Sequence, residues 1–177
     1  MKTKDIVNIA LFTTLLAVCA WICIPTAVPF TMQTFAVFLA VQVLGGKKGT
    51  IVIGVYMLLG IMGVPVFSGG TAGIGSVMGP TGGYMIGWIF LSIIFGVFEP
   101  LSEGRKWAEM IVLIAGLCIC YGFGTFWFMY IYAKGNTNTD LLMVLSTCVI
   151  PFIVPDFVKL MLSSTVSKRI KRIVKNV

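Results

Sequence analysis

Apolar residues run along this chain in long blocks, and short polar or glycine-rich segments separate the blocks. Most blocks approach the roughly 20 residues that an α-helix needs to cross the hydrocarbon core of a bilayer. The pattern therefore predicts an all-α integral membrane protein, with six transmembrane helices in one bundle and a single domain over residues 1–177. We expect the spans at residues 6–24, 28–44, 50–67, 82–98, 107–132 and 155–172.

The last apolar block, residues 141–166, is too long for one span. As a single helix it would measure about 39 Å, against a hydrocarbon core of about 30 Å. It also contains Pro151 and Pro155, and proline removes a backbone hydrogen bond from a helix. We therefore expect a short extra helix at the outer surface over residues 139–150. The last span would begin at Pro155 with Asp156 as its N-cap, which places Lys159 in the first turn.

Basic residues occur in alternate connections between the blocks. Lysine and arginine concentrate in short cytoplasmic loops, so this distribution places both termini in the cytoplasm. The net charge of +7 then follows from topology and from attraction to anionic lipid, without a nucleic-acid partner. The predicted cytoplasmic residues are Lys2, Lys4, Lys47, Lys48, Arg105, Lys106 and the basic tail at 168–177, and Lys134 is predicted to lie outside.

Composition supports the same class. Mean hydropathy is +1.02 and only 11% of residues are charged, whereas soluble domains carry about 25% charged residues. The five cysteines lie in apolar stretches without a paired spacing, so we interpret them as packing residues, and the absence of histidine excludes a histidine-ligated metal. No cofactor is expected. With six acidic residues, of which one lies in a candidate pocket, an enzyme is not expected either.

Polar groups and glycines gather at the predicted outer end. The segment between residues 63 and 83 holds eight glycines, and irregular backbone at membrane depth is tolerated where it lines a cavity. We expect this segment to form one wall of a pocket. It lacks the Gly-Lys-Ser/Thr ending of a phosphate-binding loop. Gln33, at the start of the second span, is either a further pocket residue or a polar contact between helices.

Asp156 and Lys159 are the ionisable residues predicted inside the last span. One interpretation is an internal ion pair that fixes the helix start while Lys159 extends toward the surface. The other is a ligand site, because ionisable residues inside spans are costly and usually face a ligand or a pathway.

Four segments taken in order carry a specific resemblance: "VPFTMQTFAVFLAVQVLGGKKG", "GVYMLLGIMGVPVFSGG", "GPTGGYMIGW" and "PFIVPDFVKLML". They resemble the BioY family, the biotin-binding S components of energy-coupling factor (ECF) transporters. The resemblance implies a six-helix protein of a prokaryotic cytoplasmic membrane that captures biotin at its outer face. It also implies docking on a coupling module made of a transmembrane T component and two ATPases, since this chain has no nucleotide motif of its own.

Biotin offers a ureido group, an apolar thioether ring and a carboxylate tail. Asp156 is expected to accept a ureido N–H, and Lys159 to donate to the ureido oxygen or to the carboxylate. No arginine lies between Ile51 and Gly104 to hold the tail, so this contact is left to Lys159. The further residues expected at the ligand are Gln33, Thr71, Thr81 and Tyr84, the backbone at Gly70, Gly79, Gly82 and Gly83, and Trp88 and Phe67 as apolar cover.

The first helix resembles the docking helix of S components, which carries a pattern of small residues. Here Ala10 and Thr14, and Thr13 and Ala17, are spaced four residues apart, although ordinary packing inside the bundle would explain them too. The alternative function is an S component for a different vitamin or small molecule. A thiamin or riboflavin site would require more stacking aromatic residues than this loop provides.

Overall fold

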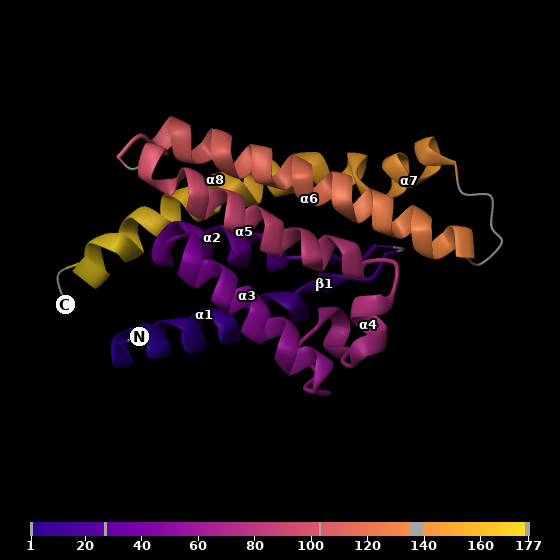
Figure 1. Ribbon diagram of the computed structural model, residues 1–177, viewed down its shortest axis with the longest axis horizontal. Coiled ribbons are helices and arrows are strands. Elements are labelled where there is room, and N and C mark those ends of the chain that lie inside the picture. The colour runs from indigo at the N-terminus through magenta and orange to yellow at the C-terminus, as the bar shows by residue number, and fades with distance from the viewer. Residues whose placement is uncertain (1, 27, 103, 135–139, 176–177) are drawn as a thin grey trace.

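A computed structural model describes residues 2–26, 28–102, 104–134 and 140–175. The side chains of Ala133, Lys134 and residues 173–175 lie outside this description, as do residues 176 and 177 of the predicted tail. Within it the chain is almost entirely helical (Figure 1). The elements are α1 (Thr3–Trp21), β1 (Cys23–Ile24), β2 (Phe30–Thr31), α2 (Gln33–Leu44), α3 (Gly46–Ile61), the 3₁₀ turn η1 (Ser68–Gly70), α4 (Ile74–Met78), α5 (Gly82–Ser102), α6 (Lys106–Lys134), α7 (Leu141–Cys148) and α8 (Ile150–Lys175).

Four helical segments among the described residues are long and apolar enough to cross a membrane: Thr3–Trp21, Gly82–Ser102, Lys106–Tyr132 and Leu141–Arg172, the last joining α7 and α8. The predicted second and third spans hold shorter helices, because α2 has 12 residues and α3 has 16. The chain is therefore a mainly helical, multi-pass membrane protein.

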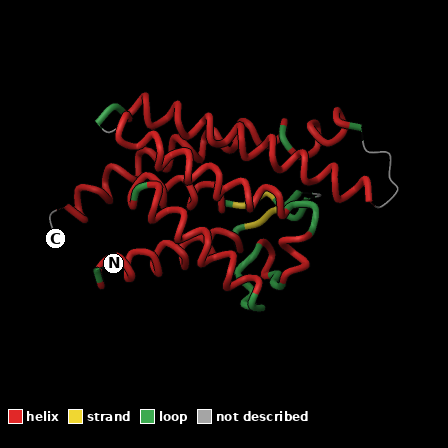
Figure 2. The backbone as a smooth tube through the Cα atoms, viewed as in Figure 1, coloured by secondary structure: helices red, strands yellow, loops and turns green. Residues whose placement is uncertain are grey.

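A small hairpin precedes α2, and the sequence pattern did not predict it. Strands β1 and β2 pair antiparallel, with Cys23 opposite Thr31 and Ile24 opposite Phe30. Figure 2 shows the two short strands toward the end of the bundle that carries α4. Because the hairpin occupies residues up to Thr31, α2 begins at Gln33 and not near residue 28.

The turn between α2 and α3 brings three segments together. Gly45 adopts φ 82°, a left-handed conformation that glycine tolerates best. The N–H of Gly46 then donates to the Glu99 carboxylate of α5 at 3.0 Å, and a negative charge at a helix N-terminus is favourable. A Cβ added at Gly46 would lie 2.2 Å from the Cα of Gly96, so glycine allows α3 and α5 to cross in backbone contact.

The last helix differs from the expectation. It begins at Ile150, so Asp156 is not its N-cap but lies in the second turn, and Lys159 lies in the third. The break from α7 falls at Val149, which has φ −122° and ψ −58°. Pro151 lies in the first turn, where backbone N–H groups need no helical partner, and Pro155 then costs one hydrogen bond inside the helix. This is why two prolines did not delay the helix start.

The bundle has two distinct ends. Both termini and the α5–α6 connection lie at one end, and the hairpin, α4 and the start of α7 lie toward the other (Figure 1). Helix α5 packs along α6, and α2 packs against α8, α3 and α1. The core between them includes Leu16, Phe38, Tyr56, Leu91 and Leu160, all buried. Large apolar side chains such as Leu11, Val97 and Leu142 are exposed, as expected for helices that face lipid.

Candidate functional site

A cavity lies near the hairpin end, between α2, α5, α6 and α8. One part of its wall is polar and the other is apolar, which is the usual composition of a site for a small organic molecule. The polar lining residues are Thr31, Gln33, Thr34, Ser68, Thr81, Tyr84, Tyr121, Asp156 and Lys159. The apolar lining residues are Val28, Pro29, Met85, Trp88, Leu117, Cys120, Cys148 and Phe152.

An ion pair forms the charged part of this wall. The Lys159 ammonium lies 2.8 Å from Asp156 Oδ1, one helical turn away on α8, and the side chains are only 5% and 4% exposed. Lys159 does not extend to the surface, so that part of the first interpretation is wrong. The ammonium also lies 4.3 Å from the ring centroid of Phe30 on the hairpin, within the range of a cation–π contact.

Two hydroxyl groups from other helices add hydrogen bonds to the pair. Thr34 Oγ1 accepts from Lys159 at 3.1 Å and donates to Asp156 Oδ1 at 2.9 Å. Tyr121, in the middle of α6, donates to Asp156 Oδ2 at 2.6 Å. A buried charge pair is tolerated when further hydrogen bonds satisfy its atoms, and here α2 and α6 supply them.

A second polar group surrounds Gln33. Its side-chain carbonyl accepts from Thr31 Oγ1 at 2.8 Å, and its amide donates to the hydroxyl of Tyr56 at 2.6 Å. Tyr56 in turn donates to the carbonyl of Val66 at 2.9 Å. Gln33 is therefore both a polar contact between α2 and α3 and a cavity residue, so both interpretations of this amide apply.

Five of the ten predicted binding residues line the cavity: Gln33, Thr81, Tyr84, Asp156 and Lys159. The structure brings these five together from α2, the start of α5 and α8. The other five, Thr71, Gly70, Gly79, Gly82 and Gly83, are not among its lining residues. Trp88 lines the cavity, whereas Phe67 is buried in the core against Tyr56.

Close packing explains two glycines at the end of the loop, Gly82 and Gly83. A Cβ at Gly82 would lie 1.7 Å from the carbonyl of Val77, and one at Gly83 would lie 2.3 Å from Cβ of Trp127. The carbonyl of Gly79 accepts from the Trp127 indole N–H at 3.0 Å. Gly70 has φ 76°, and Thr71 closes the same turn by donating to the carbonyl of Ser68. This loop therefore fixes the start of α5, which carries Tyr84 and Trp88 into the cavity.

Thr34 and Tyr121 are the important residues that sequence reasoning missed. Thr34 follows Gln33 directly, and a hydroxyl beside a recognised polar residue at a helix start was an available signal. Tyr121 lies mid-way along a long apolar segment, where a phenol needs a hydrogen-bond partner. Its partner, Asp156, is 35 residues further along the chain, which no local pattern reveals.

The free hydrogen-bonding capacity of the site determines what it can bind. The ammonium of Lys159 has three N–H groups and uses two of them on oxygen atoms, and Asp156 Oδ2 accepts a single described bond. The wall can thus donate to one ligand group and accept from another at adjacent positions. Among the described residues there is no group of three His, Cys, Asp or Glu side chains that could hold a metal ion.

The fold and this cavity define a class: a multi-pass membrane protein with a buried polar site for a small molecule near one end of its bundle. Comparison with known proteins then gives the family. The chain belongs to the BioY family, which it matches over residues 1–176.

Two relatives in this family align over nearly the whole chain. The biotin transporter BioY of Thermotoga maritima is 36% identical over 96% of this chain and 97% of its own length. A probable biotin transporter BioY of Pyrococcus horikoshii is 37% identical, over 97% and 98% respectively. The crystal structure of the S component for biotin from an ECF-type ABC transporter superposes with a TM-score of 0.83 and 27% identity, over 97% of this chain and 95% of that one. These relatives are transport proteins, not enzymes.

Proposed function

We propose that this chain is the biotin-binding S component of an ECF transporter, located in the cytoplasmic membrane of a prokaryote. The observation that carries the proposal is the buried Asp156–Lys159 pair in the lined cavity, in a chain whose relatives are named biotin transporters. The proposal needs no cofactor, because biotin is the transported ligand and remains chemically unchanged.

The polar and apolar parts of the cavity wall match the polar groups and the apolar ring system of biotin. Asp156 Oδ2 accepts a ureido N–H, and the remaining N–H of Lys159 donates to the ureido oxygen or to the carboxylate. Trp88 and Phe152 cover the apolar ring system. Thr81 and Tyr84, at the start of α5, add directional contacts. The loop residues Thr71, Gly70, Gly79, Gly82 and Gly83 act behind this wall by holding α5 in place.

The proposed topology has six spans, with the cavity toward the outer face and both termini in the cytoplasm. The spans are α1, α2 extended by the hairpin, α3, α5, α6 and α8, and α7 is the short outer helix. The basic residues support this orientation. Lys4 lies near the N-terminus, Lys106 begins α6, and Lys168 and Lys171 lie near the C-terminal end of α8. Figure 1 shows these three segments at the end of the bundle opposite the hairpin.

Uptake requires a source of energy, and we propose that a T component and two ATPases supply it. The docking surface is the outward face of α1, where Ala10 and Thr14 are exposed beside the apolar side chain of Leu11. Small residues let another helix approach closely. Thr13 is buried instead and contacts the carbonyl of Val52, and Ala17 packs on the core, so these two support α1 from behind.

Titration of the detergent-purified protein with biotin tests the proposal. Wild type should bind biotin, and Asp156→Asn and Lys159→Met should each weaken binding about tenfold or more, since a hydrogen bond to a charged group contributes about 1.5 to 3 kcal/mol. Asp5→Asn and Lys48→Met are matched controls, because they alter an ion pair at the other end of the bundle. Folded wild-type protein that fails to bind biotin would refute the assignment.

A further inference from the structure

A second cavity lies at the end of the bundle opposite the hairpin, between the start of α6 and the last part of α8. It has a volume of about 270 Å³, several times the roughly 30 Å³ that one water occupies in the liquid. It is distinct from the first cavity, with which it shares no lining residue. Its lining residues are Gly104, Lys106, Glu109, Met110, Ser164, Ser167, Lys168 and Lys171.

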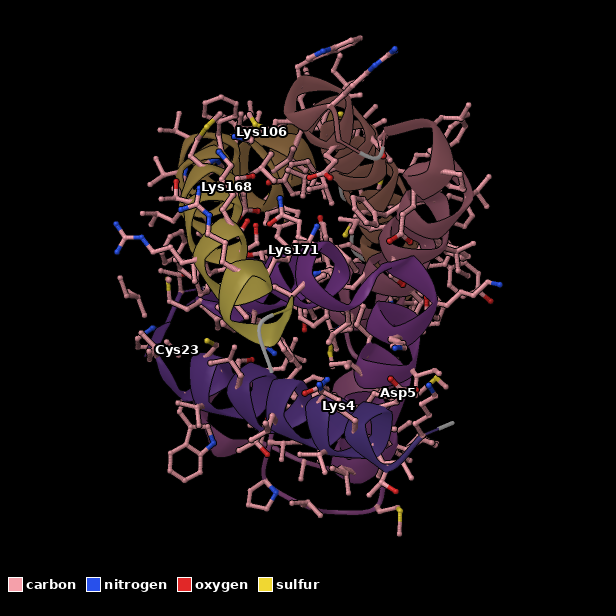
Figure 3. The ribbon with its side chains drawn as sticks, turned by 90° about the vertical axis from the view of Figure 1, so that its left-hand side faces the viewer. Lys4, Asp5, Cys23, Lys106, Lys168 and Lys171 are labelled. Atoms are coloured by element: carbon pink, nitrogen blue, oxygen red, sulfur yellow. The ribbon has the colours of Figure 1, made fainter. Side chains whose placement is uncertain are left out.

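Three lysines from two helices converge on this cavity. Lys106 opens α6, and Lys168 and Lys171 lie more than sixty residues later on α8. Figure 3 looks onto this end and shows Lys106, Lys168 and Lys171 above Lys4 and Asp5. With Glu109 as the one acidic lining residue, the formal charge of the lining is three minus one, or +2.

The charges of this cluster are not balanced within the described residues. The two ion pairs found there join Lys48 to Asp5 and Lys159 to Asp156, and neither includes a lysine of this cavity. The charge of Lys106, on the facing helix, lowers the pKa of Lys168 below its ordinary value, so these two ammonium groups repel each other. An anion placed between them would relieve this repulsion.

The residues around the second cavity are typical of the headgroup region of a bilayer. Trp107 and Leu101, on either side of the α5–α6 connection, are 65% and 73% exposed, and exposed tryptophan is typical of a membrane–water interface. Two serines, Ser164 and Ser167, add hydroxyl groups to the lining. Basic pockets between helices on the cytoplasmic side are suited to phosphate-bearing headgroups.

We propose that the cavity formed by Lys106, Lys168 and Lys171 binds the phosphate of an anionic ligand, supplied by a lipid headgroup or by free phosphate. The site is separate from the biotin cavity and does not depend on the identity of the ligand there. A bound phosphodiester would join α6 to α8, two helices that pack mainly against α5 and α2 respectively.

The test uses the delipidated full-length protein and two probes. In the first arm, native mass spectrometry compares retention of phosphatidylglycerol and phosphatidylcholine with identical acyl chains. In the second, equilibrium dialysis measures binding of radiolabelled inorganic phosphate. The variants are K168Q/K171Q on α8 and K106Q on α6. The matched control is R169Q/R172Q, which removes two positive charges from the same stretch of α8 at positions that do not line the cavity.

Each lysine near an anionic group contributes about fivefold in affinity, so K168Q/K171Q should weaken binding about twenty-five-fold. K106Q should weaken it about fivefold, and R169Q/R172Q should have little effect. A loss in the phosphatidylglycerol arm identifies a lipid site, and a loss confined to the inorganic phosphate arm identifies a free-phosphate site. Equal losses in the lysine and arginine variants, or no binding of either probe by wild type, would overturn the proposal. Melting temperatures verify that all variants remain folded.

Discussion

The buried ion pair makes a specific prediction about stability without ligand. Asp156→Asn leaves the Lys159 ammonium without a counter-charge, and Lys159→Met leaves the Asp156 carboxylate alone, in positions that are almost fully buried. The double variant removes both charges at once. The loss in free energy of unfolding caused by each single substitution should therefore be much larger than half of the loss caused by the double substitution.

The magnitude follows from burial. Removing one partner of a buried pair costs about 3 to 5 kcal/mol, whereas replacing both by neutral groups of similar size is often close to neutral. The double variant still loses the hydrogen bond that Lys159 donates to Thr34 and weakens the one that Thr34 donates to Asp156, at about 1 kcal/mol each. Since about 1 kcal/mol shifts the melting temperature of a chain this size by roughly 2 to 4 °C, each single variant should melt roughly 6 to 20 °C lower.

Thermal unfolding of the four detergent-purified proteins, without biotin, measures this cycle. The predicted coupling energy between the two positions is about 4 kcal/mol or more, the sum of the two single losses less the loss in the double variant. The pair of Lys48 and Asp5 provides the comparison, because its side chains are 41% and 22% exposed and an exposed pair contributes about 1 kcal/mol or less. If the losses of Asp156→Asn and Lys159→Met simply add in the double variant, the pair is not the buried, mutually dependent unit described above.

Three further predictions concern packing, hydroxyl contacts and thiols. Gly46→Ala should lower stability by about 2 kcal/mol or more, because its Cβ meets the Cα of Gly96, whereas Gly54→Ala on the same helix has open space and should be neutral or stabilising; equal melting temperatures would contradict the close crossing. Thr34→Val and Tyr121→Phe should each weaken biotin binding about threefold or more by releasing Asp156, while Thr14→Val on the exposed face of α1 should bind as wild type does. Bound biotin should slow alkylation of Cys120 and Cys148, which line the cavity, and leave the exposed Cys118 unchanged; equal protection of all three, as mass spectrometry would detect, would argue for a global effect instead.

Local patterns were sufficient for the long helices and for part of the site. The apolar blocks predicted α1, α5 and α6, because a helix that crosses the hydrocarbon core needs about 20 consecutive apolar residues and such a run is visible in the sequence. The spacing of Asp156 and Lys159 predicted a shared helix face, and their ion pair confirms it. Gln33, Thr81 and Tyr84 were predicted near this pair, and they line the same cavity.

Contacts between distant segments could not be predicted in this way. Thr34 lies 122 residues from Asp156, and only the packing of α2 on α8 brings them together. The two-residue strands of the hairpin are too short to leave a periodic signal. The sequence pattern placed the start of α8 five residues too late. It treated Pro151 as a helix breaker, although proline is tolerated in the first turn of a helix and destabilises it only further inside.

Equilibrium binding of radiolabelled biotin to purified wild-type protein, with unlabelled biotin, thiamin and riboflavin as competitors, is the decisive test of the biotin site. We expect saturable binding of one biotin per chain, displaced by biotin and not by the other two vitamins. Displacement by thiamin or riboflavin at similar concentrations would contradict it, and so would folded protein that binds no biotin.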